Sequence, residues 1–184
     1  MENLKLNTPL TIEEIDFRVQ SVNKGGYATI LAYKDARVDM NRLDAVYGVD
    51  GWQKKYDLIN GNLFCSVGIF SDKSKEWIWK QDVGTESNTE KEKGQASDAF
   101  KRACFNLGIG RELYEYPIIQ IKLNPDEYEV KEWQGKKKAQ PTFNFKLKDW
   151  IWGSKFDENE NLIQLSAKDQ NGNLRFNWKK QTTK

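Results

Sequence analysis

The chain has 184 residues, and 29 Lys and Arg residues nearly balance 27 Asp and Glu residues, so the formal net charge is only +2. Hydrophobic residues make up 38% of the sequence and aromatic residues 12%, which is enough apolar mass for a folded core and excludes a wholly disordered chain. The sequence contains no histidine, which excludes Ser-His-Asp and Cys-His catalysis and any His-ligated zinc or haem site.

The N-terminal part of the chain predicts two helices around a strand. Residues 1–10 are polar and are expected to be loose. A capping-box pattern at Thr11 predicts a short helix that includes Val19. β-branched and aromatic residues over 27–33 favour a strand, and apolar residues at helical spacing favour a helix from Asp39, its N-cap, to Tyr47.

The clearest local pattern is an antiparallel meander of three strands. Strands are expected over 52–59 and 62–70, because the intervening Asn60-Gly61 is the strongest short signal for a two-residue hairpin turn. A polar turn then leads to a third strand over 77–83.

A helix is expected to follow the meander and to end near Gly108, a glycine at the usual C-terminal position. Its buried stripe, at the helical spacing of three and four residues, consists of Ala96, Ala99, Phe100, Ala103, Cys104 and Leu107. We therefore expect an α+β fold whose core, over 11–116, is an antiparallel β-meander packed on a long α-helix.

The composition changes after Pro117, and residues 117–184 are expected to form a β-rich C-terminal extension. Residues 124–140 are interpreted as a polar connection. The run Lys136-Lys137-Lys138 within it is more simply a solvated loop than a phosphate contact. Strands are expected over 118–123, 143–147, 162–168 and 174–178, the last two joined by a hairpin turn at Asn171-Gly172.

The helix after the meander carries two cations that flank an aromatic side chain. On a helical wheel Lys101 and Arg102 lie on either side of Phe105, outside the buried stripe. Such a surface can neutralise phosphates and stack bases. The alternative, which the pattern alone favours, is an ordinary solvated face in which Asp98 and Arg102 form an i, i+4 ion pair.

A second candidate is the segment between the first strand and the following helix, where Lys34 and Arg37 are expected in a loop. Loops that a scaffold positions often carry binding groups. The alternative, again favoured by the sequence, is that the two cations pair with Asp35 and Asp39.

A third candidate is a metal-dependent nuclease site. Asp82 and Glu86, with a nearby lysine, would supply the carboxylates that hold Mg²⁺ in such enzymes. The more favoured alternative is that Asp82 caps backbone amides where the strand ends at Gly84. Because the sequence contains no G-x-x-x-x-G-K-[ST] phosphate loop, it gives no support for an ATP-driven mechanism, and no cofactor is expected.

Several of these segments occur in an order that resembles a known family. The ordered set is Arg37-Val38, Gly51-Trp52, Asp82-Val83-Gly84, Lys101-Arg102-Ala103 and Leu107-Gly108. It resembles the single-strand annealing proteins of the Rad-fifty-two/Rad-twenty-two type, in their short phage and prophage versions. The resemblance extends over nearly half of the chain and does not include residues 117–184.

The resemblance implies subunits that assemble into rings or helical filaments and hold single-stranded DNA in a basic groove. The DNA backbone then lies inward and the bases outward, so that a complementary strand pairs without nucleotide hydrolysis. By motif position Arg37, Lys101 and Arg102 match DNA-contacting residues of the family, whereas Phe105 stands where the family commonly has a basic residue. The expected DNA-binding set is Arg37, Lys101, Arg102, Lys91, Lys93, Lys34 and Phe105.

We therefore predict ATP-independent binding and annealing of single-stranded DNA in homologous recombination and DNA repair, by an oligomer that is not an enzyme. The expected partners are single-stranded DNA, further copies of the chain and a single-strand-binding protein. Without a signal peptide or a membrane-spanning run, the expected location is the cytoplasm of a bacterial or phage-infected cell. The alternatives are the Mg²⁺-dependent nuclease and a non-enzymatic protein-interaction module. Such a module would bind its partner through the C-terminal hairpin and aromatic residues expected to be exposed, which are Trp133, Trp150 and Trp152.

Overall fold

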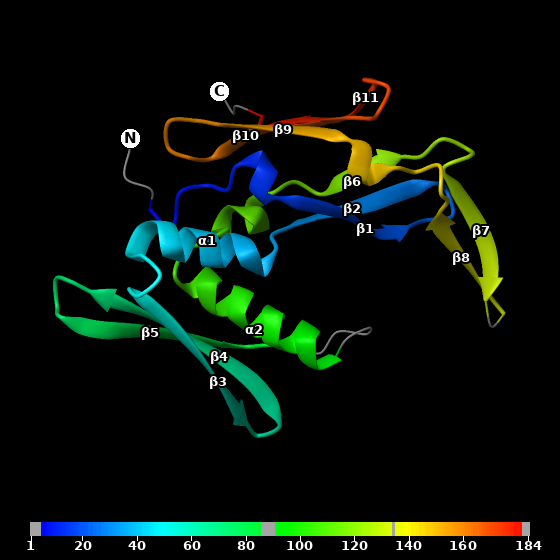
Figure 1. The fold of residues 1–184 in the computed structure, drawn as a ribbon. Coiled ribbons are helices and arrows are strands. Elements are labelled where there is room, and N and C mark those ends of the chain that lie inside the picture. The colour runs from blue at the N-terminus through cyan, green and yellow to red at the C-terminus, as the bar shows by residue number, and fades with distance from the viewer. Residues whose placement is uncertain (1–4, 86–90, 134, 182–184) are drawn as a thin grey trace. The chain divides into compact units, whose positions relative to one another are not determined.

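The computed structural model describes residues 5–85, 91–133 and 135–181, and the chain forms two compact units (Figure 1). Unit 1 consists of Met1–Leu10 and Lys34–Arg111, and unit 2 consists of Thr11–Tyr33 and Glu112–Lys184. Within the described residues the chain has two α-helices and antiparallel strand pairings, which confirms the expected α+β class. None of the described helices has both the length and the apolar character that a membrane crossing requires.

Unit 1 is a three-stranded sheet, in the order β3-β4-β5, with a helix packed on one face. Its elements are α1 (Ala36–Tyr47), β3 (Trp52–Ile59), β4 (Asn62–Ser71), β5 (Glu76–Val83) and α2 (Lys91–Asn106). The expected meander is confirmed, and Asn60 and Gly61 both have the positive φ that a tight hairpin turn requires. Ala99 and Ala103 on α2 are fully buried, which allows the helix to lie close to the sheet.

Helix α1 begins earlier than the sequence indicates. Asp35 is its N-cap, because its side chain accepts a hydrogen bond from the Arg37 N–H at 2.8 Å. The expectation that Asp39 caps this helix is therefore wrong. Asp39 lies within the helix and is fully buried. Its carboxylate pairs with the buried Lys34, so it does not cap the backbone at the helix start.

Unit 2 contains two antiparallel sheets, one of order β6-β2-β1-β8-β7 and one of order β11-β10-β9. Their strands are β1 (Asp16–Val22), β2 (Tyr27–Tyr33), β6 (Ile119–Lys122), β7 (Tyr128–Trp133), β8 (Lys136–Pro141), β9 (Ile151–Phe156), β10 (Leu162–Lys168) and β11 (Leu174–Lys179). Both sheets contribute to one apolar core, which includes Ile30, Ile121 and Leu165. Residues 11–116, expected as one core, are thus shared between the units, because β2 pairs with β6 and β1 with β8.

The expected helix from Thr11 to Val19 is wrong. The capping box is present, but it closes only a 3-10 turn over Ile12–Glu14, after which the chain extends as β1. Phe17 and Val19, two residues apart on β1, pack against the core of unit 2. Because aromatic and β-branched side chains suit a half-buried strand, this packing overrides the local signal for a helix start.

Two expectations for the C-terminal extension are also wrong. Residues 124–140 contain the β7–β8 hairpin instead of an open connection, because Gly135, at a φ of 73°, turns the chain between two pairing segments. Residues 143–147 turn instead of extending, and the Phe145 N–H donates to the carbonyl oxygen of Thr142 at 3.2 Å. The alternating apolar residues there do not form a strand; Phe145 and Leu147 are buried from a turn and a 3-10 helix.

Of the three tryptophans considered as an exposed protein-binding set, Trp150 belongs to the core of unit 2 and Trp152 packs against it. Trp150 is only 6% exposed, and Trp152 stacks on Phe17 with ring centroids 3.7 Å apart. The side chain of Trp133 lies outside the described part of the chain. The expectation of exposure is wrong for Trp150, because the packing of unit 2 covers it.

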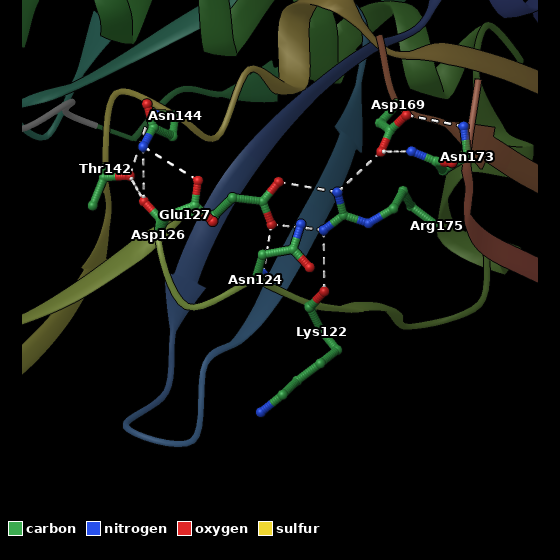
Figure 2. Close-up of polar contacts among 9 residues, drawn as sticks. All are labelled: Lys122, Asn124, Asp126, Glu127, Thr142, Asn144, Asp169, Asn173 and Arg175. Carbon is green, nitrogen blue, oxygen red and sulfur yellow. Dashed lines mark hydrogen bonds and ion pairs between the residues drawn. The ribbon is translucent and has the colours of Figure 1, made fainter. Parts of the chain in front are cut away.

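A buried ion-pair network ties the loops of unit 2 together (Figure 2). Arg175 on β11 donates from Nη2 to Glu127 Oε2 at 2.7 Å and from Nη1 to Glu127 Oε1 at 3.0 Å. Its Nη1 also lies 3.4 Å from Asp169 Oδ2, and its Nη2 lies 3.2 Å from the carbonyl oxygen of Lys122. The guanidinium lies 4.8 Å from the ring centroid of Trp150. Arg175 thus links the loop between β6 and β7 to the β10–β11 hairpin.

Candidate nucleic-acid interface

The start of α1 holds two of the predicted cations in different environments. Arg37 lies in the first turn of α1 with 81% of its side chain exposed, and its Nε is 2.9 Å from Asp35 Oδ1. Lys34 precedes the helix, has only 7% of its side chain exposed, and pairs with the fully buried Asp39. Arg37 is therefore placed to reach a ligand in solvent, whereas Lys34 is held inside unit 1.

The Lys34–Asp39 pair has the properties of an architectural contact. Burial raises the pKa of Asp39 to about 6, although the charges of Lys34 and Lys101 oppose this rise. Within the described residues, Asp39 Oδ2 has no hydrogen-bond partner. Gly110 leaves room for the pair, because a Cβ at that position would lie 2.8 Å from Lys34 Cε. The pair thus fixes the start of α1 against the glycine-containing segment that follows α2.

Helix α2 presents Lys101 and Arg102 to different neighbours. Hydrogen bonds from Arg37 lower the pKa of Asp35, and the charge of Lys101 lowers it further, so Lys101 lies on the α1 side of the helix. Arg102 has 44% of its side chain exposed, and its Nε lies 3.2 Å from Asp82 Oδ1 on β5. Arg37 and Lys101 therefore share an acidic neighbour, while Arg102 faces the strand.

Asp82, considered as a metal ligand, is occupied by donors from the protein. Its Oδ1 accepts from Arg102 Nε and from the Val83 N–H, the latter at 2.7 Å, and its Oδ2 accepts from Asn106 Nδ2 at 3.3 Å. The other considered ligand, Glu86, lies outside the described residues. Where the structure describes the chain, no three His, Cys, Asp or Glu groups gather as a metal site would need. Asp82 fixes the end of β5 to α2.

Phe105 has a cation beside it that the sequence reasoning missed. The guanidinium carbon of Arg111 lies 5.7 Å from the ring centroid of Phe105. Arg111 Nε donates to the carbonyl oxygen of Phe105 at 2.8 Å, and its Nη2 donates to that of Asn106 at 2.9 Å. This cation at the helix C-terminus complements the helix dipole. The signal in the sequence is the basic residue directly after Gly108 and Gly110, where the chain turns back on the helix.

The Asp-Val-Gly motif forms a joint between β5 and α2. A Cβ on Gly84 would lie 2.1 Å from a backbone oxygen of α2 and 2.9 Å from Ala99 Cβ, so only glycine allows this close approach. Beside it, the N–H and the hydroxyl of Thr85 both donate to Asp98 Oδ2 at 3.0 Å. Asp98 therefore binds Thr85, and the expected ion pair of Asp98 with Arg102 is replaced by the contact of Arg102 with Asp82.

The other predicted cations lie in two further places. The backbones of Lys91 and Lys93 belong to α2, but their side chains lie outside the described residues. Lys136-Lys137-Lys138 lies on β8 of unit 2, and all three lysines are exposed. Besides Lys91, Lys93 and the buried Arg42, the helices α1 and α2 and the position just after α2 carry Arg37, Lys101, Arg102 and Arg111.

No protein-family model matches the chain, but two known proteins are similar to it. A protein from Deinococcus radiodurans named single-stranded DNA-binding protein DdrA is 30% identical over 116 residues, which cover 61% of this chain and 54% of the relative. The protein of the same name from Deinococcus deserti is 30% identical over 123 residues, which cover 65% of this chain and 60% of the relative. The chain thus spans little more than half the length of these relatives.

Proposed function

We propose that the chain binds single-stranded DNA and anneals complementary strands without nucleotide hydrolysis, in recombination and repair. The observation that carries the proposal is the set of cations on α1, on α2 and just after α2 in unit 1. This set consists of the predicted Arg37, Lys101 and Arg102 and of Arg111, which the structure adds. The similarity to two proteins named single-stranded DNA-binding protein supports the same ligand.

Binding of phosphates would replace ion pairs within the protein. Arg37 lies beside Asp35 and Arg102 beside Asp82, and the carboxylates are themselves 42% and 22% exposed. Exposed ion pairs are worth only ~0–1 kcal/mol, so a phosphate can displace the carboxylate at small cost. The counterions released from DNA then supply affinity that does not depend on base sequence.

Annealing follows if the backbone of the DNA is held and the bases remain free. A second strand can then test its pairing, and base pairing drives the reaction, so no acid–base group or nucleotide is needed. Assembly of several copies into a ring or filament would repeat the basic surface along one strand. Such repetition raises the overall affinity well above that of one subunit.

The proposal is tested with a labelled oligonucleotide and its complement, in buffer with EDTA and without nucleotide. The wild-type protein should bind the oligonucleotide and accelerate duplex formation. Arg37→Ala and Lys101→Ala should each weaken binding by about tenfold, which corresponds to ~1.4 kcal/mol. Lys73→Ala, which removes an exposed lysine from the turn between β4 and β5, is the matched control. Absence of binding by the wild type, or equal binding by all variants, would refute the proposal.

A further inference from the structure

The sheet of unit 1 has a second face that α2 does not cover. On β3, Lys54 Nζ lies 4.5 Å from the Phe100 ring centroid, and Tyr56 donates to the Ala96 carbonyl oxygen, so these side chains face α2. Side chains alternate between the faces of a strand, and residues paired across antiparallel strands share a face. The opposite face, which we call the outer face, carries Gln53, Lys55, Asp57, Ile59, Asn62, Phe64, Ser66, Gly68, Phe70, Trp77, Trp79, Gln81 and Val83. Figure 1 shows α2 along the other side of this sheet.

Trp79 lies flat on the outer face. It pairs with Gly68, and a Cβ on Gly68 would lie 3.0 Å from each of three atoms of the six-membered ring of Trp79. A point equally distant from three atoms of a ring lies on the ring axis, so the indole covers the glycine with its plane along the sheet. Any larger residue at position 68 would lift the ring. One π-face of Trp79 is thus turned away from the sheet, and the residue is 40% exposed.

Trp79 belongs to a line of aromatic rings that ends in a cation. The centroids of Trp77 and Trp79 are 6.3 Å apart, and those of Phe70 and Trp77 are 5.6 Å apart. On the other side, Lys55 Nζ lies 5.2 Å from the Trp79 centroid. Trp77 is 38% exposed. Exposed, adjoining aromatic side chains of this kind mark binding surfaces more often than isolated apolar residues do.

We propose that the outer face is a stacking surface for the bases of single-stranded DNA, with Trp79 as its centre and Lys55 as its phosphate contact. The proposal rests on the proposed function and adds a second contact region to it. Sequence-independent binding of single strands combines aromatic side chains, on which bases stack, with basic groups that follow the backbone. Lys55 can release the indole for a base and turn its ammonium to the neighbouring phosphate, because its stem is long and flexible.

The polar groups around Trp79 favour a nucleic acid over an apolar protein surface. The Lys55 ammonium lies on the central ring, and Gln81 Nε2 donates to Ser66 Oγ at 2.9 Å beside it. An apolar partner would bury the ammonium without a counter-charge, which is unfavourable. A nucleotide supplies both a π-face for the indole and a phosphate for the lysine. The acid of this face, Asp57, is two cross-strand pairs away from Trp79.

The spacing of the rings favours a single strand over a duplex. Successive bases in a B-DNA strand are about 3.4 Å apart along the axis. The two indole centroids are 6.3 Å apart, so neighbouring bases can stack on both only if the strand is stretched to about twice that rise. A single strand can be stretched in this way, whereas bases in a duplex are already stacked on each other.

The experiment compares a thymidine oligonucleotide with an abasic oligonucleotide of equal length, both labelled, by fluorescence anisotropy. Trp79→Ala should weaken binding of the thymidine strand by about 5- to 150-fold, the range for removal of one base–aromatic stack. It should leave binding of the abasic strand within about twofold, since the phosphates are unchanged. Trp79→Phe should restore most of the affinity, which guards against a misfolded alanine variant.

The matched control is Phe143→Ala, because Phe143 is 88% exposed in unit 2 and also has a lysine, Lys146, 5.7 Å from its ring centroid. This control should bind both strands like the wild type. Equal weakening of both strands by Trp79→Ala, or a changed molecular mass in light scattering, would overturn the proposal in favour of a contact between protein copies. Unchanged binding of both strands would also overturn it. If the wild type binds neither strand, the proposed function itself fails; if only the Arg37 and Lys101 variants bind more weakly, the stacking surface alone fails.

Discussion

Arg175 of unit 2 and two arginines of unit 1, Arg37 and Arg102, lie in opposite surroundings. In unit 2, Arg175 is 11% exposed and donates to Glu127, to Asp169 and to a backbone carbonyl (Figure 2). In unit 1, Arg37 and Arg102 are 81% and 44% exposed and lie beside carboxylates that also reach solvent. The surroundings, and not the residue type, therefore decide whether an arginine stabilises the fold or can contact a ligand.

The largest effect is expected where the arginine is most enclosed. Arg175→Ala would leave Glu127, whose side chain is 7% exposed, as a buried charge without its partner. Removal of one member of a buried pair costs about 3–5 kcal/mol in the free energy of unfolding. Urea unfolding measures this cost, with Arg37→Ala as the exposed control, for which a change below about 1 kcal/mol is expected. Similar destabilisation of the two variants would refute the contrast between the enclosed Arg175 and the exposed Arg37.

The buried acid of unit 1 should give a pH-dependent stability. Because burial raises the pKa of Asp39 from 3.8 to about 6, the folded state holds a proton that the unfolded state releases between these values. The contribution of Asp39 protonation to the free energy of unfolding is therefore fully present below about pH 4 and is lost as the pH rises through 6. The pKa shift of Asp39 from 3.8 to about 6 corresponds to ~3 kcal/mol.

We therefore expect the free energy of unfolding of the wild type to fall by about 2 kcal/mol relative to Asp39→Asn between pH 4 and pH 7, which is most of the full linkage. Urea unfolding of both proteins across this range measures the difference. A constant difference would show that Asp39 has the same pKa in the folded and unfolded states.

The smallest effect is expected from a carboxylate that competes with DNA. Asp82→Asn keeps an oxygen that can accept from the Val83 N–H but removes the charge beside Arg102. Under the proposed function Arg102 then binds phosphate more readily, and affinity for a labelled oligonucleotide should rise by about two- to fivefold, the worth of an exposed ion pair. Asp72→Asn, at an exposed pair with Lys75, is the control. Weaker binding by Asp82→Asn would contradict a competing role for Asp82.

Elements that depend on local signals are predictable from the sequence. The Asn60-Gly61 turn and the alternating strands around it fix the meander, and β2 occupies the expected residues 27–33. The capping box at Thr11 forms as expected, but only a 3-10 turn follows it. The chain then extends as a strand, because Phe17 packs against the core of unit 2. Local patterns thus predict turns and strands well where distant residues do not compete for the same side chains.

The candidate site shows the same limit. Lys34 and Arg37 look alike in the sequence, yet only the structure separates the buried cation from the exposed one. Arg111 escapes prediction because its position over Phe105 depends on the turn after α2. Arg175 and Glu127 are 48 residues apart, and no local pattern links them. Contacts of this kind depend on tertiary packing, which a single sequence does not specify residue by residue.

The central claim is that Arg37 and Lys101 contact the phosphates of single-stranded DNA, and the salt dependence of binding tests it most directly. The slope of log affinity against log salt should fall by about 0.7 for each phosphate of a single strand that the protein no longer neutralises. The double variant Arg37→Ala/Lys101→Ala should therefore have a slope smaller by about 1.4 than the wild type. The control Lys73→Ala/Lys148→Ala, which removes two exposed charges elsewhere, should keep the wild-type slope. An unchanged slope in the Arg37/Lys101 variant would contradict the account.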